Sequence, residues 1–442
     1  MKTTIVTPST RKVRREVRGG KRGGGWQMQR ERRRIRRPDP RSIQLATNTT
    51  GLTGVAGLVE FATFVHAQGL HRQLAKQFGH LKKRRSVVYP MAAQLRLLVD
   101  LHVVGEGRVF GLVAMAHDPL FVHLAGGTVP SIDVLYDDLA RFGEKDLARL
   151  ERLVAKQALE RLSEKRPTIV HIDIDTTVTE LFGSQEGALA GPNPRYRGRP
   201  SYHPMLARIA ETGDICGAVL RPGDRGFGAE DVPTIVGWLE RVRNTVGPDC
   251  VIRVRIDAAG DLTELLCAFE RLGVHYYTKA RMTRNLADAL AMHASWRSVD
   301  HDAMGKPTLQ VATLPFQRPD WNRAGITPRI VALRSRERDN GKHLYLWEHL
   351  DYTAQAFVTN DWTLDEEEIA RLYDDRASIE PVIGELKSAW CIGKAPSASF
   401  DGNHAAFLVK LLAYNLYRAF LAARYAPLAK WRTSWSRRMV IL

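Results

Sequence analysis

Apolar residues recur at three- and four-residue spacing through the first third of the chain. The stretches LVEFATFVHAQGLHRQLAKQFG, YPMAAQLRLLVDLHVV and EKDLARLERLVAKQALERL all show this spacing, with turn or breaker residues between them. Such spacing places the apolar side chains on one face of a helix. The pattern therefore predicts an all-helical domain over residues 46–165.

The period changes between Pro167 and Met282, where short β-rich runs appear. TIVHIDID, YHPMLARIAE and ICGAVLRPG come first, and then helical and β-rich runs alternate as EDVPTIVGWLERVR, CVIRVRID, DLTELLCAFERL and VHYYTKAR. Three strands followed by alternating helices and strands indicate a mixed sheet with helices packed on it. We expect an α/β core over residues 166–282.

Residues 283–365 break this rhythm with polar segments that contain tryptophan. Several of them alternate polar and apolar residues, which predicts an insertion that carries a small sheet. We expect Trp296, Trp321 and Trp347 to pack in its core, and stacking on a flipped base is the alternative. Helical spacing resumes in DEEEIARLYDDRASI and NHAAFLVKLLAYNLYRAFLAARY.

Positive charge is concentrated near the N-terminus. The 442 residues have a formal net charge of +17, and fifteen Lys and Arg against Glu16, Glu31 and Asp39 give residues 1–41 a charge of +12. Because this Gly- and Arg-rich stretch is nearly free of apolar residues, we expect residues 1–45 to form a disordered tail. Its composition suits contact with a polyanion. A leader that only improves solubility is the alternative.

The composition argues against a secreted or membrane-spanning protein. Lys410 and Arg418 interrupt the longest apolar stretch, and the N-terminus lacks the apolar region of a signal peptide. The four cysteines are far apart and show no CxxC pairing, which argues against a zinc ribbon or a disulfide framework and favours buried thiols. They are Cys216, Cys250, Cys267 and Cys391. We expect a cytoplasmic protein with no membrane partner.

Acidic residues lie along the first predicted strand. In TIVHIDIDTT, the two-residue period of a strand sets His171, Asp173 and Asp175 on one face. Carboxylates on a sheet face are costly to desolvate unless a cation or hydrogen bonds compensate, and Mg²⁺ or Mn²⁺ is such a cation. The alternative is an Asp that caps the strand end beside the hydroxyls of Thr176 and Thr177.

A second acid, Asp257, ends the strand-like run VIRVRID and is followed by the small-residue turn AAG. Open α/β folds usually build their sites at the carboxyl ends of sheet strands. Strand-end Asp residues are also common in ordinary turns, so this position is weak evidence when taken alone.

The third acidic run is YDDRASIEPVIGELK. In a continuous helix, Tyr373, Arg376, Glu380 and Lys387 would share an arc of about 60°. A solvated face of mixed charge is the alternative. Pro381 follows Glu380 directly, and a helix that starts at this proline would remove Tyr373 and Arg376 from the shared face.

In combination these runs resemble the DDE transposases of bacterial insertion sequences. Asp175 lies in DTT, Asp257 lies in RIDAAG, and the signature Y-x2-R-x3-E-x6-K is matched at every position of the third run. The phrases HIDIDTTVTELFGSQEGA, RPSYHPMLARIAETGDI and LRPGD resemble the insertion-sequence 1380 family in particular. The resemblance covers residues 46–425.

The resemblance implies a ribonuclease-H-like catalytic core with a mainly β insertion, preceded by an all-helical N-terminal domain. The core would comprise residues 166–282 and 366–442, the latter with the C-terminal helices, and the insertion would be residues 283–365. Residues 46–165 would bind DNA at the terminal inverted repeats. The family also implies double-stranded DNA as partner, a homodimer on paired ends and a place in the bacterial nucleoid.

The same resemblance implies the chemistry. Asp175, Asp257 and Glu380 would hold two Mg²⁺ ions, with Mn²⁺ as a substitute, for hydrolysis of the phosphodiester at the transposon end. The freed 3′-hydroxyl would then attack target DNA. The signature residues Tyr373, Arg376 and Lys387 would contact a phosphate beside the scissile bond.

One further candidate DNA contact and two alternative functions complete the expectations. The loop GPNPRYRGRPSYHP carries Arg195, Arg197 and Arg199 among aromatic residues, which suits nucleic-acid binding, although a solvated loop fits equally well. A catalytically inactive or truncated transposase-derived DNA-binding protein is the main alternative, favoured by Pro381 and by the end of the chain at WRTSWSRRMVIL. A nuclease that cuts without strand transfer is the weaker one.

Overall fold

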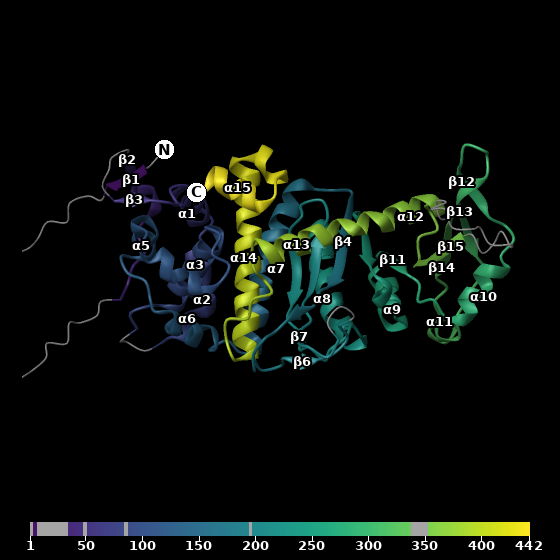
Figure 1. Cartoon of the computed structure of the whole chain (residues 1–442), viewed down its shortest axis with the longest axis horizontal. Helices are drawn as coiled ribbons and strands as arrows, with labels where there is room; N and C mark the ends of the chain where they lie inside the picture. Colours follow the sequence, from purple (N-terminus) through teal and green to yellow (C-terminus); the bar gives the residue numbers. More distant parts are fainter. Residues whose placement is uncertain (1–2, 7–33, 47–50, 84–86, 194–196, 337–351) are drawn as a thin grey trace, which may run out of the picture. The chain divides into compact units, whose positions relative to one another are not determined.

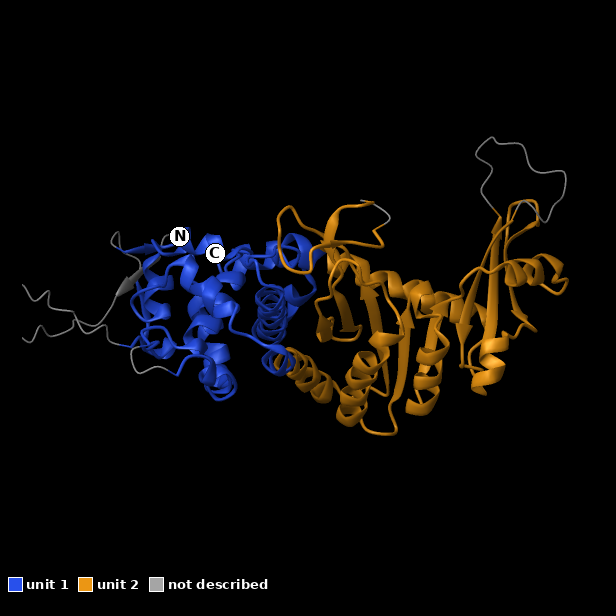
Figure 2. Ribbon diagram, turned by 90° about the horizontal axis from the view of Figure 1, so that it is seen from below, with its two compact units in different colours: residues 1–150, 385–442 blue, residues 151–384 orange. Residues whose placement is uncertain are grey.

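The structure is a computed structural model of the whole chain. It describes residues 3–6, 34–46, 51–83, 87–193, 197–336 and 352–442. The chain divides into two compact units, which are residues 1–150 with 385–442 and residues 151–384 (Figure 2).

The unit of residues 1–150 and 385–442 is mainly helical (Figure 1). It contains α1 (Leu58–Ala67), α2 (Leu70–Phe78), α3 (Met91–Val103), α4 (Leu112–Met115), α5 (Pro119–Ala125), α6 (Ile132–Leu139), α14 (Phe400–Arg424) and α15 (Thr433–Val440). Helices α3 and α14 are buried over most of their length and pack against each other, with α1, α2 and α6 around them. This packing forms the core of the unit.

Helices α1 and α2 were expected as one continuous pattern. Gly69 separates them with φ of 69°, in the left-handed region where glycine has no Cβ penalty. Helix α5 starts at Pro119 after Asp118, whose side chain accepts hydrogen bonds from the amides of Leu120 and Phe121. Local sequence thus explains both boundaries.

Helix α14 is long and apolar enough to cross a membrane by length and composition alone, and it is the one such helix in the parts of the chain that are described. Its most apolar 18-residue window is 89% buried inside the structure. Lys410 interrupts it and donates hydrogen bonds to the carbonyls of Cys391 (2.7 Å) and Lys394 (2.9 Å). Packing as a core helix accounts for the apolar composition of α14.

Part of the segment that was expected to be a disordered tail is ordered. Strand β1 (Thr3–Val6) pairs with β2 (Gln44–Ala46) and β3 (Leu52–Thr53), and the amide of Ile35 donates to the carbonyl of Val88 at 2.9 Å. The expectation of disorder is therefore wrong for residues 34–45, because these residues find hydrogen-bond and ion-pair partners on the helical unit. Residues 7–33 lie outside the described part.

The unit of residues 151–384 is built on one nine-stranded sheet with the order β12-β13-β14-β15-β11-β10-β4-β8-β9. Its strands are β4 (Ile169–Thr176), β8 (Met205–Ile209), β9 (Ile215–Val219), β10 (Val251–Ile256), β11 (His275–Lys279), β12 (Arg297–His301), β13 (Pro307–Leu314), β14 (Arg329–Arg336) and β15 (Tyr352–Thr359). Strands β4, β10 and β11 are parallel, and the other pairs are antiparallel.

Two sets of helices cover the central part of this sheet. One face, which carries Ile172, Ile174 and Val254, packs against α7 (Glu144–Lys165), α8 (Val232–Val246) and α9 (Thr263–Leu272). On the other face, α12 (Glu366–Asp374) packs through Ile369 and Tyr373 on the strands. Figure 1 shows α12 and α13 (Ile379–Ser388) running across the strands. Because side chains alternate along β4 and β10, the apolar side chains of one face contact α7, α8 and α9, while the other face is covered by α12.

The predicted insertion does not form a separate small sheet. Its strands β12 to β15 continue the main sheet, because β15 pairs with β11. The insertion also contains α10 (Arg284–Met292) and α11 (Pro319–Ala324). Trp321 is buried, as expected for core packing, Trp296 is half-buried, and Trp347 lies outside the described residues.

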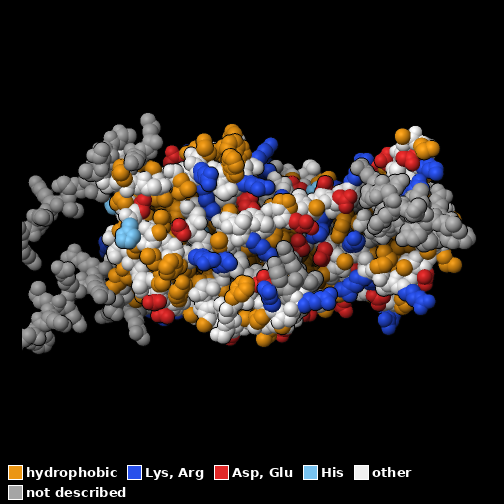
Figure 3. Space-filling model, viewed as in Figure 1, with side chains coloured by type: hydrophobic (Ala, Val, Ile, Leu, Met, Phe, Trp, Pro, Cys, Tyr) orange, Lys and Arg blue, Asp and Glu red, His pale blue; other side chains and the backbone are white. Residues whose placement is uncertain are grey.

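Helix α15 exposes large apolar side chains, and two of the four cysteines are less buried than expected. Helix α15 and the turn before it leave Trp431, Trp435 and Met439 exposed, and Figure 3 shows hydrophobic side chains gathered at that helix. Of the four cysteines, Cys216 and Cys250 are buried as expected, whereas Cys267 and Cys391 are half-buried; all four are free thiols.

Candidate active site

Two of the three predicted acids lie side by side at one edge of the sheet. In the parallel pair of β4 and β10, Ile174 lies opposite Ile256, so the next residues, Asp175 and Asp257, are neighbours at the carboxyl ends of their strands. Residues in register on adjacent strands point to the same face. Both carboxylates therefore belong to the face that α12 covers.

The turn after β10 holds Asp257 in place. Its carboxylate accepts a hydrogen bond from the amide of Ala259 (3.0 Å), and its carbonyl accepts one from the hydroxyl of Thr278 (2.6 Å). The turn needs Gly260, because a Cβ there would lie 2.1 Å from Cγ2 of Ile256. The sequence RIDAAG thus fixes the position of this acid through both its backbone and its small residues.

The segment that carries the third acid is not one continuous helix. Helix α12 ends at Asp374, a 3-10 turn spans Asp375–Ser378, and α13 starts at Ile379. Pro381 lies in the first turn of α13. Amides of the first turn have no hydrogen-bond acceptor within the helix, so the missing N–H of proline costs nothing there. Helix α13 therefore starts two residues before the proline. The prediction that the four signature residues share one face of a continuous helix is wrong.

Arg376 nevertheless joins the third acid to the first. Its Nη1 lies 3.6 Å from Oδ2 of Asp175, and its Nη2 lies 3.7 Å from Oε1 of Glu380. The side chains of Arg376 and Asp175 are 12% and 13% exposed, whereas that of Glu380 is 64% exposed. The 3-10 turn thus brings the Arg and Glu of the signature to the strand-end acids.

Burial, together with the charges at this edge, perturbs the ionisation of Asp175. Burial raises its pKa to about 6; Arg376 opposes the rise, and the charges of Asp257 and Glu380 add to it. Burial also works to lower the pKa of Arg376, but the facing charges of Asp175, Tyr373 and Asp257 outweigh it and raise that pKa above the usual value. The edge therefore concentrates negative charge that one arginine partly neutralises.

Tyr373 lies in the small core between α12 and the sheet. It is 9% exposed, and its ring centroid lies 4.7 Å from that of Phe357. The guanidinium of Arg376 lies 5.8 Å from the centre of the Tyr373 ring. Tyr373 thus contacts the arginine of the site while its ring is held by packing.

Behind these acids, Asp173 forms a buried network that ties the sheet to the helical segment. It accepts hydrogen bonds from Arg255 Nε (2.6 Å) and Arg208 Nη1 (3.3 Å) and is fully buried. Arg255 also donates to the carbonyl of Leu372 (3.1 Å), and Arg208 donates to the hydroxyl of Ser378 (2.9 Å). A metal ion was one candidate for offsetting the cost of burying the Asp173 carboxylate. The structure shows that two arginines do so instead.

Three functional candidates at this edge were missed in the sequence. Arg208 and Arg255 pair with Asp173, and the two-residue period of VIRVRID already sets Arg255 on the face of Asp257. Lys279 ends β11 and follows Thr278, which lies opposite Ile256, so Lys279 is next in register to Asp257. The positions of Arg208 and Lys279 beside the acids depend on which strands are neighbours, and the sequence alone does not give that order.

The remaining predicted site residues are Lys387 and the three arginines of the loop before β7. Lys387 is on α13, in the part of that helix that belongs to the unit of residues 1–150 and 385–442. Arg197 is exposed, and Arg199 is exposed with an ion pair to Glu180 at 3.1 Å. They precede β7 (Pro200–Tyr202), which forms a small sheet with β5 (Thr179–Glu180) and β6 (Leu189–Ala190). Arg195 lies outside the described residues.

The donor set suits a divalent metal ion without forming a finished metal centre. Asp175 and Asp257 offer the hard carboxylate oxygens that a divalent cation binds, and Asp175 is largely buried, so a bound cation would offset the cost of its desolvation. Across the described ranges, no three His, Cys, Asp or Glu side chains form a ready-made metal site. A three-carboxylate set at this edge would require the exposed side chain of Glu380 to turn toward Asp175 and Asp257.

Comparison with known proteins gives one family match and similar solved structures. The family model described as Transposase DDE domain group 1 matches residues 36–439. No curated protein matches the chain. Among solved structures, a cryo-EM structure of the piggyBac transposase synaptic complex with hairpin DNA is similar over 87% of this chain and 79% of that chain, at 10% sequence identity and a TM-score of 0.45.

Proposed function

Because the chain belongs to the transposase DDE domain group 1 family, we propose that it is an active transposase of an insertion sequence of the 1380 family. It would bind the terminal inverted repeats, cleave DNA at the ends and join the 3′-hydroxyl ends to target DNA. The observation that carries the proposal is the placement of Asp175 and Asp257 at neighbouring strand ends, with Arg376 between Asp175 and Glu380.

The sheet supports a ribonuclease-H-like core. Read in chain order, β4, β8 and β9 form an antiparallel meander, and β10 and β11 follow as parallel strands on the other side of β4. This gives a five-stranded core to which the insertion adds β15 and its neighbours. The proposed catalytic residues then lie at the carboxyl ends of its two central parallel strands.

Asp175, Asp257 and Glu380 would hold the Mg²⁺ ions that the family uses, with Mn²⁺ as a substitute. The chemistry that bound metal supplies here is activation of water and stabilisation of the charge that develops on the phosphate. Asp257 is already oriented for this role, because the amide of Ala259 holds its carboxylate. Glu380, with its exposed side chain on the first turn of α13, is the acid that moves.

The signature cations would act on the DNA. Arg376 lies between two of the acids, where its guanidinium can donate hydrogen bonds to a phosphate oxygen. Since the ring of Tyr373 is buried, its role would be to position Arg376. Lys387 would contact a phosphate beside the scissile bond, and Arg195, Arg197 and Arg199 would contact the DNA backbone.

The wider context follows from the same proposal. The partners would be double-stranded DNA of the transposon ends and of the target, bound by a homodimer on paired ends. The helices of residues 46–165 would recognise the terminal inverted repeats. The place of action would be the bacterial nucleoid.

Excision from a donor plasmid that carries the element's ends tests this function. We expect the wild-type protein with Mg²⁺ to release the element and to join it to a target plasmid, and Asp257→Asn to abolish both steps. Asp288→Asn, an exposed residue on α10, is the control and leaves both steps intact. Cleavage without joining would indicate the nuclease. Binding of end DNA without any cleavage would indicate the inactive DNA-binding protein and contradict the proposal.

A further inference from the structure

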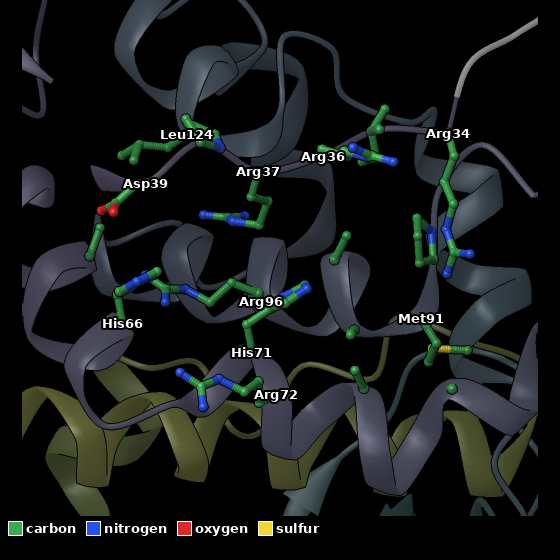
Figure 4. Close-up of a pocket in the computed structure, with 18 of the residues that line it drawn as sticks. Arg34, Arg36, Arg37, Asp39, His66, His71, Arg72, Met91, Arg96 and Leu124 are labelled. Atoms are coloured by element: carbon green, nitrogen blue, oxygen red, sulfur yellow. The ribbon is translucent and has the colours of Figure 1, made fainter. Parts of the chain in front are cut away.

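A basic cavity lies in the helical unit, away from the acids of the active site. Its volume is about 670 Å³, within the usual range for ligand sites, and residues 34–40 line one side while α1, α2 and α3 line the other (Figure 4). Six arginine and lysine side chains line it: Arg34, Arg36, Arg37, Arg72, Lys82 and Arg96. All of its lining residues belong to the unit of residues 1–150 and 385–442.

Two of these arginines share a single acid. Arg37 extends from residues 34–40 toward α3, where Arg96 lies (Figure 4). Arg37 donates to one carboxylate oxygen of Asp100, and Arg96 Nε donates to the other at 2.9 Å. The side chains of Arg37, Arg96 and Asp100 are 11%, 5% and 2% exposed. This buried cluster therefore carries one uncompensated positive charge.

A buried donor of this cluster has no partner. Nη1 of Arg37 is inaccessible to solvent and makes no hydrogen bond with any described residue. Unpaired buried donors of charged groups are costly, so they usually mark a missing ligand or water. Burial lowers the pKa of Arg37 to about 10, and the charge of Arg96 adds to the fall while Asp100 opposes it.

The other charged residues of the lining do not neutralise the positive charge of this cluster. The acid that lines the cavity, Asp39, forms an ion pair with Arg41 at 2.6 Å, and Lys82 forms one with Asp138 at 2.7 Å. No acidic residue in the described ranges pairs with Arg36 or Arg72.

We propose that this cavity is a phosphate-binding site and that a backbone phosphate of the bound DNA occupies it. Phosphate oxygens match guanidinium groups in geometry, and several arginines around one anion are the usual way to hold it. The cavity is large enough for a phosphodiester with part of its sugar. The inference rests on the proposed function, because it takes DNA as the source of the phosphate.

The salt dependence of DNA binding by the full-length protein tests the site. Arg36→Gln with Arg72→Gln removes two exposed guanidinium groups from the lining, while the buried Arg37, Arg96 and Asp100 stay in place. Each phosphate contact contributes about 0.9 to the slope of log K against log salt concentration, so we expect the slope to fall by about 1 to 2. We expect Kd for a duplex carrying the element's end to rise on the order of tenfold.

Matched variants separate this site from a general loss of positive charge. Arg424→Gln with Arg438→Gln removes the same charge from exposed positions of the same unit outside the cavity and should change the slope by less than about half as much. Arg36→Lys with Arg72→Lys keeps the charge and should restore most of the slope. An equal effect of the cavity and control pairs would overturn the proposal.

A second probe distinguishes the source of the phosphate. Inorganic phosphate should raise Tm of the wild-type protein more than that of the Arg36→Gln/Arg72→Gln variant, because it binds the folded state only. If phosphate does so but the DNA slope is unchanged, the site takes free phosphate and the DNA source is wrong. If wild type binds no end DNA at all, the proposed function fails, whereas normal DNA binding by the cavity variant rejects only the role of this cavity in DNA binding.

Discussion

Arg376 is the residue on which the charge balance of the candidate active site depends. It lies 3.6 Å from Asp175 and 3.7 Å from Glu380, and it is the cation that opposes the rise in the pKa of Asp175. Because like charges at neighbouring strand ends repel each other, this arginine stabilises the site when Asp175 is ionised.

Arg376→Gln should therefore destabilise the protein in a pH-dependent way. The folded-state pKa of Asp175 is raised to about 6, so Asp175 is ionised at pH about 8 and mostly protonated at pH about 5. Loss of Arg376 removes a favourable interaction only from the ionised form, so Tm should fall more at the higher pH. Differential scanning calorimetry at both values measures this.

The control is Arg371→Gln, which removes an exposed arginine from α12 that pairs with Glu367. It should lower Tm equally and only slightly at both pH values. A pH-independent effect of Arg376→Gln would mean that Arg376 does not interact with the ionised carboxylate of Asp175.

At the scale of elements, three strands and the helical segment are joined by one buried ion network. Asp173 on β4 binds Arg208 of β8 and Arg255 of β10, and these arginines reach Leu372 on α12 and Ser378 in the 3-10 turn. The network thus fixes where the segment with Arg376 and Glu380 lies on the sheet.

Asp173→Asn should be strongly destabilising. It leaves two buried arginines without their common carboxylate, and removal of one partner of a buried ion pair costs about 3–5 kcal/mol. Asp249→Asn, an exposed position of the same unit, should change the free energy of unfolding by less than about 0.5 kcal/mol. Urea unfolding measures both, and equal values for the two variants would show that the network does not hold the segment.

The elements show how far the sequence predicts this fold. Strands β4 and β10 and helices α8 and α9 follow from their periods, because each has one apolar face. The pairing of β15 with β11 does not follow, since backbone hydrogen bonds between strands far apart in sequence leave no periodic signal.

The candidate site was predictable in its acids and less so in its supporting residues. Asp175, Asp257 and Glu380 stand out through strand ends and the signature spacing, whereas Arg208 is linked to Asp173 only by the β4 and β8 register. The break between α12 and α13 was missed as well. Pro381 indicated that a helix starts nearby. The exact start at Ile379 follows from the 3-10 turn before it, which the sequence pattern does not show.

At the scale of the whole molecule, the stability of the helical unit depends on pH through the core of α14. Lys410 is 2% exposed, and burial lowers its pKa to about 7. The neighbouring cations Lys394 and Arg108 add to this fall. Its amine donates to two carbonyls and has no described carboxylate as partner.

Lys410 should therefore make the protein more stable as the pH rises. Between its folded-state pKa of about 7 and its unfolded value of 10.5, the unfolded state binds the proton and the folded state does not. The free energy of unfolding should rise from pH about 7 to about 9.5 by on the order of a few kcal/mol. Lys410→Met should remove most of this rise.

Lys76→Met, at an exposed position on α2, is the matched control and should leave the rise in place. Urea unfolding at the two pH values gives the comparison. If the Lys410→Met protein keeps the full rise, the buried amine is not its source.

The central claim is that Asp175, Asp257 and Glu380 act as one catalytic unit. The most direct test is the rate of Mg²⁺-dependent strand cleavage at an element end by Asp175→Asn, Asp257→Asn, Glu380→Gln and the variant with all three changes. Each single change should lower the rate by at least on the order of a hundredfold, and the triple variant should be no slower than the slowest single one. Cleavage that persists at the wild-type rate in any of the three would contradict the assignment.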